Sequence, residues 1–341
     1  MRALYAYFMK GVKPVEQANQ EADIPWPLSM RWPLAIWRWL FAPAVEDFKP
    51  DAGKDVVLNR GAYLVEGLGH CGACHTPRAL TMQEKALSAS DSPAFLSGSA
   101  PLEGWIAKNL RGDHKDGLGS WSEDQLVQFL KTGRSDRSAV FGGMSDVIVH
   151  SMQYMSDADL TAIARYLKSL PAVNPADKPH QYDPAVADAL WNGDDSKRGA
   201  AVYIDNCAAC HRTDGHGYTR VFPALAGNPV LQSADPTSLI HIVLKGGTLP
   251  ATHTAPSTFT MPAFDWRLSD QEVADVVNEL VGAGMELKQA MEFAPVAAKF
   301  VVGQGSSGVD TAKMIQALQS NANITDPKVL EKALEAVAFQ G

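Results

Sequence analysis

Two short motifs contain every cysteine of this 341-residue chain. Each motif is a Cys-x-x-Cys pair followed at once by a histidine, CGACH at 71–75 and CAACH at 207–211. In such a motif the two thiols can form thioether links to the vinyl groups of one porphyrin, while the histidine lies under the iron. The motifs therefore predict two covalent c-type haems, with His75 and His211 as proximal ligands. The attachment residues are Cys71, Cys74, Cys207 and Cys210.

Three other uses of paired cysteines are less well matched by the sequence. A four-cysteine zinc site normally has about 15 to 20 residues between its pairs, whereas Cys74 and Cys207 lie far apart and zinc leaves both histidines unexplained. A thioredoxin-like redox pair needs a βαβ setting, which the flanking sequences lack. Two structural disulfides are the third alternative. Haem attachment is favoured over all three.

The sequence around the motifs is repeated. RGAYLVEGLGHC (60–71) and RGAAVYIDNC (198–207) both carry an apolar stripe at helical spacing into the cysteines, which predicts a first helix in each repeat. Helices are also predicted at 155–171 and 268–284, because Ser156 and Ser269 are N-cap residues with Asp159 and Glu272 three positions later. These are the final helices of the two repeats.

A middle helix is predicted in each repeat. WSEDQLVQFLKTGR (121–134) contains a Ser122 to Gln125 capping box, and in DPTSLIHIVLKGG (235–247) Asp235 is the expected cap with Pro236 at the first helical position. No strand pattern accompanies these helices. The fold class is therefore all-α, with two haem domains at 50–172 and 185–284, called here the first and second units, and a Pro-rich linker at 173–184.

Methionine is the expected sixth ligand, because it raises the reduction potential and closes the iron to small molecules. Met261, in FTMPAF, is the single methionine between the second motif and the following helix. In the first unit Met155 aligns with core residue Leu268, and Met144 in the loop VFGGMSDV matches the setting of Met261 best, with Met152 as the main alternative.

A second contact is expected at the proximal histidine of the second unit. The Pro223 carbonyl in FPALAG is a candidate acceptor for a hydrogen bond from the His211 ring, which would orient that ligand. The alternative is that Pro223 only makes a rigid turn.

The chain resembles the multihaem cytochrome c subunit of bacterial membrane-bound dehydrogenases, which oxidise alcohols, aldehydes, gluconate or fructose. The resemblance runs from residue 1 to about 281 and rests on DIPWPLSMRWPLAIWRWLF, CGACHTPRALTMQEKAL, AVFGGMSDV, CAACH and FTMPAFDWRLSDQEVADVVN. It implies two tandem cytochrome c-type domains with long haem-wrapping loops, and axial pairs of His75 with Met144 and His211 with Met261.

The resemblance also implies a role without catalysis by the chain itself. A partner subunit with flavin or pyrroloquinoline quinone would oxidise the substrate, and the haems would pass electrons to ubiquinone. The expected location is the periplasmic face of the bacterial inner membrane, as a peripheral protein. The alternatives are a dihaem enzyme such as a peroxidase, which needs an open or His-ligated haem, and a free-standing dihaem electron carrier.

Net charge and hydropathy indicate which partners, nucleic acid or membrane, the chain is expected to bind. The net charge is −8 and Lys and Arg form no cluster, which argues against nucleic acid. No stretch of about 18 apolar residues predicts a membrane-spanning helix. The Trp-rich segment with Trp26, Trp32, Trp37 and Trp39 is expected at the lipid headgroups or at the dehydrogenase subunit, or packed as a structured linker.

The two ends of the chain carry expectations of their own. MRALYAYFMKGV aligns with the final helices of both units, so residues 1–49 are interpreted as the remnant of the final helix of a further haem domain plus the Trp/Pro-rich linker. A third haem and an export signal are expected upstream, since these residues do not read as a secretory signal. The tail, 285–341, is expected to be helical with no assigned role. Its GQGSSG (303–308) lacks the room a dinucleotide site needs.

Overall fold

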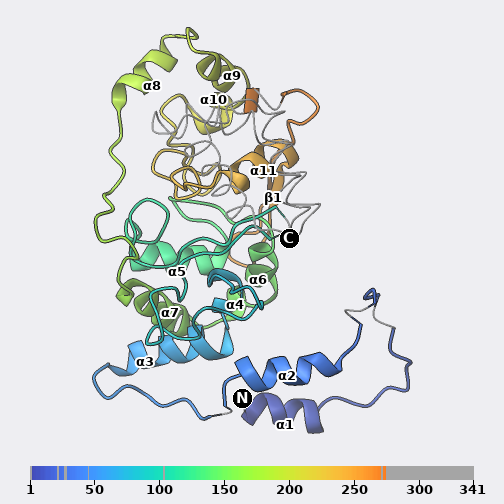
Figure 1. The fold of residues 1–341 in the computed structure, drawn as a ribbon. Helices are drawn as coiled ribbons and strands as arrows, with labels where there is room; N and C mark the ends of the chain where they lie inside the picture. Colours follow the sequence, from blue (N-terminus) through green and yellow to red (C-terminus); the bar gives the residue numbers. More distant parts are fainter. Residues whose placement is uncertain are drawn as a thin grey trace, which may run out of the picture.

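The computed structural model describes residues 2–273 with the exception of 21, 22, 27, 28, 45, 103, 270 and 271. In this part of the chain, short helices and one two-stranded sheet make up the regular structure, joined by long loops. Figure 1 shows α3 to α7 gathered at one end of the molecule and α8 to α11 at the other. The helices are α1 (Arg2–Lys10), α2 (Trp32–Phe41), α3 (Val56–Ala62), α4 (Gly72–His75), α5 (Glu123–Thr132), α6 (Met144–His150), α7 (Asp157–Ser169), α8 (Pro184–Trp191), α9 (Arg198–Asn206), α10 (Ala208–His211) and α11 (Thr237–Lys245).

The three helices predicted in the first unit are present. The first is α3, which continues into a π-helical turn, η1 (Tyr63–Leu68), before the cysteine motif. At α5 the Ser122 hydroxyl accepts from the Gln125 backbone N–H while the Gln125 side chain accepts from the Ser122 N–H, so the predicted capping box is confirmed. Ser156 caps α7 by accepting the Asp159 N–H.

The second unit matches its prediction with one shift. The first helix is α9, as expected. The middle helix, α11, begins one residue later than predicted, because Pro236 takes the N-cap position and the Asp235 carboxylate accepts the N–H of Thr237 at 2.9 Å. Ser269 and Glu272 form the predicted reciprocal contact. The rest of the predicted final helix, 274–284, and the tail at 285–341 lie outside the described residues.

A small antiparallel sheet in the second unit was not predicted. Strands β1 (Gly247–Leu249) and β2 (Phe259–Met261) pair with Gly247 opposite Met261 and Leu249 opposite Phe259. Each strand has three residues, which is too short for an alternating pattern to stand out in the sequence. The hairpin places one predicted iron ligand, Met261, on a strand instead of in a loop.

Buried apolar side chains form two clusters. The first cluster is built from the first unit around Val65, Phe95, Ile148 and Leu160, and the second from the second unit around residues such as Val243. Each cluster also takes side chains from the other unit. Leu249 belongs to the first cluster and Phe259 packs against it, while Trp105 and Phe141 pack against the second. The two units are therefore packed into each other.

A tight crossing of α3 and α7 organises the first unit. A side chain at Gly61 would overlap the Ala162 carbonyl oxygen and lie 2.5 Å from Tyr166 Cβ, so only glycine allows this approach. One residue before it, Arg60 donates two hydrogen bonds to the carboxylate of Asp159 in the first turn of α7, at 2.7 and 3.0 Å. The repeated Arg-Gly-Ala sequence therefore has a physical role in helix packing.

The same pairing recurs in the second unit. Arg198 of its Arg-Gly-Ala lies 3.8 Å from Glu272, which holds the same position after the N-cap of the next helix as Asp159 does. The Arg of the repeated Arg-Gly-Ala sequence therefore forms an ion pair in both units, with the acidic residue three positions after the N-cap serine.

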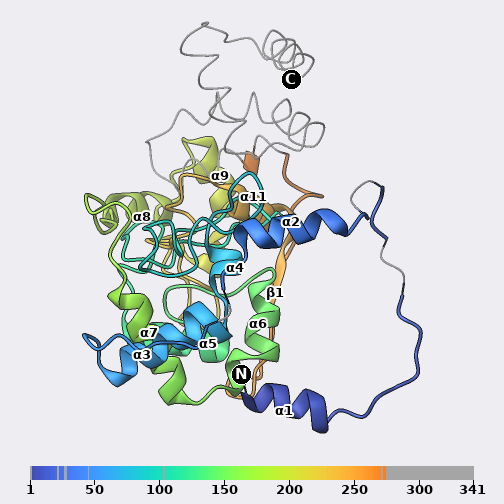
Figure 2. The ribbon, with the colours of Figure 1, turned by 60° about the horizontal axis from the view of Figure 1, so that its bottom comes forward.

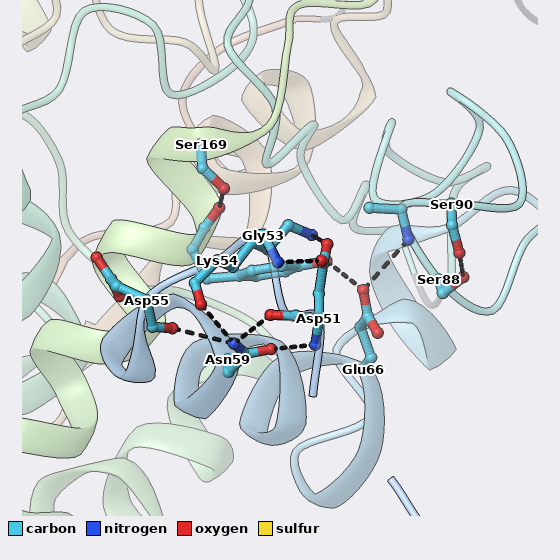
Figure 3. A network of polar contacts seen from close by, with 11 residues as sticks. Asp51, Gly53, Lys54, Asp55, Asn59, Glu66, Ser88, Ser90 and Ser169 are labelled. Carbon is cyan, nitrogen blue, oxygen red and sulfur yellow. Dashed lines mark hydrogen bonds and ion pairs between the residues drawn. The ribbon is translucent and has the colours of Figure 1, made fainter. Parts of the chain in front are cut away.

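The loop before α3 is closed by one side chain. The Asn59 amide donates to the carbonyls of Asp51, Lys54 and Asp55 and accepts the Asp51 N–H, as Figure 3 shows. Because Asn59 satisfies four backbone groups of this loop, the chain enters α3 at a fixed position.

Helices α1 and α2 bury no residue against the rest of the chain. Figure 1 and Figure 2 show α1 at the edge of the ribbon. Helix α2 is joined to the first unit by a hydrogen bond from the Trp37 indole N–H to the Thr81 carbonyl. None of the helices in the described residues has the length and apolar character needed to cross a membrane.

Replacing Gly61 by alanine tests the α3–α7 crossing. The added methyl group has no space, so the helices must separate, and we expect the free energy of unfolding to fall by about 1–3 kcal/mol. The measurement is chemical unfolding of the haem-loaded protein followed by far-UV circular dichroism. Gly67→Ala is the matched control, because a Cβ at Gly67 meets no atom within 4 Å. Equal losses for both variants would contradict the proposed crowding.

Asp113 fastens the end of the first unit. Its buried carboxylate accepts the backbone N–H groups of Val173 and Asn174 and the amide of Asn109. Burial alone would raise the pKa of Asp113, but these hydrogen bonds to the charged form outweigh burial and hold its pKa below the ordinary value. The stabilisation is therefore present above about pH 4 and is lost as the pH falls through the folded-state pKa.

Asp113→Asn should lower the free energy of unfolding by about 1–3 kcal/mol at neutral pH, since charge-assisted hydrogen bonds are lost. The difference from the parent protein should shrink as the pH is lowered toward 3, and unfolding titrations at several pH values measure it. The exposed Asp136→Asn is the control, with little change expected. A difference that is constant with pH would contradict the assignment.

Candidate haem sites

The first motif forms a single helical turn. Cys71 is the N-cap of α4, its carbonyl accepts the His75 N–H at 3.0 Å, and the turn brings Cys71, Cys74 and His75 to neighbouring positions. Cys71 is partly buried and Cys74 is exposed. Burial raises the pKa of the Cys71 thiol to about 11, so at neutral pH this sulfur is a thiol.

The ring of His75 has a defined orientation. Nδ1 lies 2.7 Å from the backbone carbonyl oxygen of Lys108. A carbonyl can only accept, so Nδ1 carries the proton and Nε2 keeps its lone pair for a metal. Burial lowers the pKa of His75, although the bond to Lys108 opposes this shift, and the neutral imidazole that iron ligation requires is favoured.

The second motif repeats this arrangement. The Cys207 carbonyl accepts the His211 N–H at 2.9 Å at the start of α10, and burial raises the pKa of Cys207 to about 11. The His211 ring contacts the Pro223 carbonyl oxygen through Nδ1 at 2.9 Å, so the predicted contact is confirmed. Burial lowers the pKa of His211, against the opposing effect of that hydrogen bond.

The structure places the candidate distal methionines in different settings. Met261 is on β2 and packs, partly buried, against the second cluster. Met144 is the first residue of α6 and not part of a loop as predicted, because the helix begins directly after the glycine pair 142–143. It packs, partly buried, against the first cluster together with Cys71. Met152 is only 7% exposed and is part of that cluster.

The two thiols and the imidazole of each motif fit the covalent attachment of one haem. The four cysteines are not paired with one another in this structure. In the described part of the chain no three His, Cys, Asp or Glu side chains converge as a metal cluster, so the two cysteine pairs do not meet in one zinc site. Each motif instead offers two thiols and one neutral imidazole with a free Nε2 on a single turn, which is what covalent haem attachment requires.

One contact of the first site was missed in the sequence. Lys108 is the counterpart of Pro223, but it acts through its backbone carbonyl, and every residue has one. Its side chain could not have indicated the role. The ion pair of Arg60 with Asp159, in contrast, had a signal in the sequence, since Arg-Gly-Ala and the acidic residue after the N-cap both recur in the second unit.

A pair of thiols and an oriented, neutral histidine on one turn, within a helical and loop-rich fold, defines a c-type cytochrome. Residues 196–280 match the cytochrome c family. The chain is 59% identical over 335 residues to the gluconate 2-dehydrogenase cytochrome c subunit of Pantoea cypripedii, an alignment that covers 97% of this chain and 73% of that protein.

Two further relatives are also cytochrome subunits of dehydrogenases. The cytochrome c subunit of the quinone alcohol dehydrogenase of Gluconacetobacter polyoxogenes is 56% identical over 279 residues, covering 82% of this chain and 60% of that protein. The fructose dehydrogenase cytochrome subunit of Gluconobacter japonicus is 35% identical over 297 residues, with 82% and 59% covered. The chain belongs to the family of cytochrome c subunits of gluconate, alcohol (quinone) and fructose dehydrogenases. It spans somewhat less than two thirds of the length of the latter two relatives.

Proposed function

We propose that the chain is an electron-transfer subunit that carries electrons through two c-type haems. The haems are attached at the four motif cysteines. The axial pairs are His75 with Met144 and His211 with Met261. The observation that carries this proposal is the same contact in both units, a motif histidine whose Nδ1 contacts a backbone carbonyl oxygen and whose Nε2 is free.

Haem iron supplies a one-electron carrier, and the residues of the chain decide how it is held. The hydrogen bonds to the carbonyls of Lys108 and Pro223 fix the tautomer and the orientation of each imidazole and raise its basicity. A methionine on the other side raises the reduction potential and closes the iron to small molecules. These properties suit an electron carrier and not a peroxidase.

The proposed partner is a dehydrogenase catalytic subunit with flavin or pyrroloquinoline quinone, and the proposed acceptor is ubiquinone. The names of the relatives support a partner that oxidises gluconate, an alcohol or fructose. The proposed place is the periplasmic face of the inner membrane, as a peripheral subunit. Co-purification of the partner, followed by assays with ethanol and with gluconate, identifies the substrate.

Substitution of the methionines tests the axial pairs. Met144→Leu and Met261→Leu should each remove the methionine-to-iron charge-transfer band of one ferric haem, lower the potential of that haem and open it to carbon monoxide. Absorption spectra of the ferric protein, and of the reduced protein with and without carbon monoxide, measure these changes. Met152→Leu is the control and should leave both haems closed.

Two results would contradict the proposal. If Met152→Leu and not Met144→Leu opens the first haem, the first axial pair is wrong. If the unsubstituted protein binds carbon monoxide, a haem is open and the dihaem enzyme is the better explanation.

Helix α2 presents an apolar surface that we assign to the membrane. Trp32, Ile36 and Trp39 lie four and three residues apart, which places them on one side of the helix, and all three are exposed. Arg31 and Arg38 are exposed beside them and suit anionic headgroups. Trp37 has another role, because its indole N–H donates to the Thr81 carbonyl at 2.7 Å and holds α2 to the first unit.

Replacing both Trp32 and Trp39 by serine should weaken binding to anionic phospholipid vesicles by roughly tenfold or more, since two aromatic side chains no longer bury in the interface. Flotation of the haem-loaded protein with the vesicles measures the bound fraction. Trp191→Ser is the matched control, because Trp191 on α8 is exposed to a similar degree. Unchanged binding of the double variant would contradict the membrane assignment and leave a protein contact as the use of this surface.

A further inference from the structure

Arg134 of the first unit has its side chain in the second unit. It lies two residues after the end of α5 and is only 4% exposed. Its Nη2 donates to the carbonyl oxygens of Ser257 at 2.7 Å, Pro250 at 3.1 Å and Ala255 at 3.4 Å. Its guanidinium carbon also lies 5.3 Å from the centre of the Phe259 ring. One buried cation of the first unit thus contacts three backbone carbonyls and one aromatic ring of the second unit.

The charge of Arg134 has no anionic partner in the described residues, where no carboxylate lies within ion-pair distance. Burial lowers the pKa of Arg134, and the nearby Arg220 lowers it further, but an arginine remains charged at neutral pH. Carbonyl dipoles and an aromatic face therefore replace the counter-ion. A buried charge held in this way fixes the position of the groups that solvate it.

The loop that Arg134 holds connects the two strands of the hairpin. Its carbonyls at 250, 255 and 257 lie between β1 and β2, and Phe259 is the first residue of β2. Leu249, the last residue of β1, is 2% exposed within the first cluster. Met261 is at the other end of β2. Both strand ends next to the loop are therefore fixed by the first unit.

The backbone near Met261 leaves little freedom to compensate. A Cβ at Gly246 would lie 2.5 Å from the Met261 carbonyl oxygen, and Gly246 has a φ of +67°. The residue before β1 therefore packs closely against the backbone of Met261, which pairs with Gly247 at the start of β1. A shift of the hairpin moves Met261 with it.

The base of Arg134 is also fixed. Its backbone N–H donates to the Thr132 hydroxyl, and its carbonyl accepts from that hydroxyl at 2.8 Å. The side chain therefore extends from a rigid helix end and not from a free loop.

We propose that Arg134 is a positioning residue for Met261, so that the first unit sets the ligation and the potential of the haem in the second unit. This inference rests on the proposed role of Met261 as an axial ligand. Arg134 does not contact the iron; it acts by holding the loop and Phe259.

The interface contains enough other contacts for an Arg134 variant to stay folded. The Asn228 amide donates to the Arg137 carbonyl at 3.1 Å, the Ile106 N–H donates to the Ser238 hydroxyl at 2.8 Å, and the His253 N–H donates to the Gln153 side chain at 3.0 Å. These bonds do not involve Arg134. The effect of a substitution is therefore expected at the hairpin and not across the whole interface.

The test is Arg134→Gln in the haem-loaded protein, in the parent and in a Met144→Leu background. In that background the remaining methionine-to-iron band reports Met261 alone. We expect Arg134→Gln to weaken or remove this band and to lower the potential of the second haem in a spectroelectrochemical titration, with haem content unchanged. Arg134→Lys should have a smaller effect, because lysine keeps the charge but not the planar set of donors.

Arg165→Gln is the matched control, since Arg165 is exposed and pairs with Glu123 of its own unit at 3.3 Å. It should leave both haems unchanged. Met261→Leu is measured in parallel. If Met261→Leu leaves the band intact, the ligand assignment fails and the inference with it. If Met261→Leu removes the band but Arg134→Gln changes neither band nor potential, the inference alone is overturned.

Discussion

A histidine can serve as an iron ligand only if it is neutral and presents one nitrogen, and both units meet this requirement through a backbone carbonyl. His75 and His211 lie on short turns that set their distance from the cysteines but not the orientation of their rings. The carbonyls of Lys108 and Pro223 provide that orientation from outside the motif. The chain must therefore return to each histidine after leaving its motif, 33 residues later in the first unit and 12 residues later in the second.

The elements that were predictable from sequence are those with a local signal. The Ser122 and Gln125 capping box and the Ser156 cap are formed by side chains a few residues apart, and each was found where the pattern placed it. The cysteine motifs were predictable for the same reason. The start of α11 was predicted one residue early, because Asp235 caps from outside the helix through Thr237.

Features that depend on contacts distant in sequence were not predictable. The Lys108 carbonyl looks like any other, and nothing near Arg134 in the sequence points to the carbonyl of Ser257. The hairpin that carries Met261 is stabilised by burial of Leu249 among first-unit side chains, so its strands could not be found from their own three residues. Tertiary packing decides these elements and local propensity does not.

Side chains of each unit pack against the apolar cluster of the other unit, so the two units are held in one fixed arrangement. Phe141 lies three residues before Met144 and packs against the second cluster, while Phe259 lies two residues before Met261 and packs against the first. Each candidate methionine segment is thus held partly by the other unit. An electron carrier with two haems benefits from such an arrangement, because the distance between its redox centres is then a property of the fold and not of a flexible linker.

The central claim is that one chain holds two closed c-type haems that each accept one electron. A spectroelectrochemical titration of the haem-loaded chain, combined with a haem count per chain, tests it most directly. The account predicts two covalent haems per chain and two one-electron steps, both with the low-spin spectrum of a closed haem. A single haem per chain, or a step that produces a high-spin ferrous haem, would contradict it.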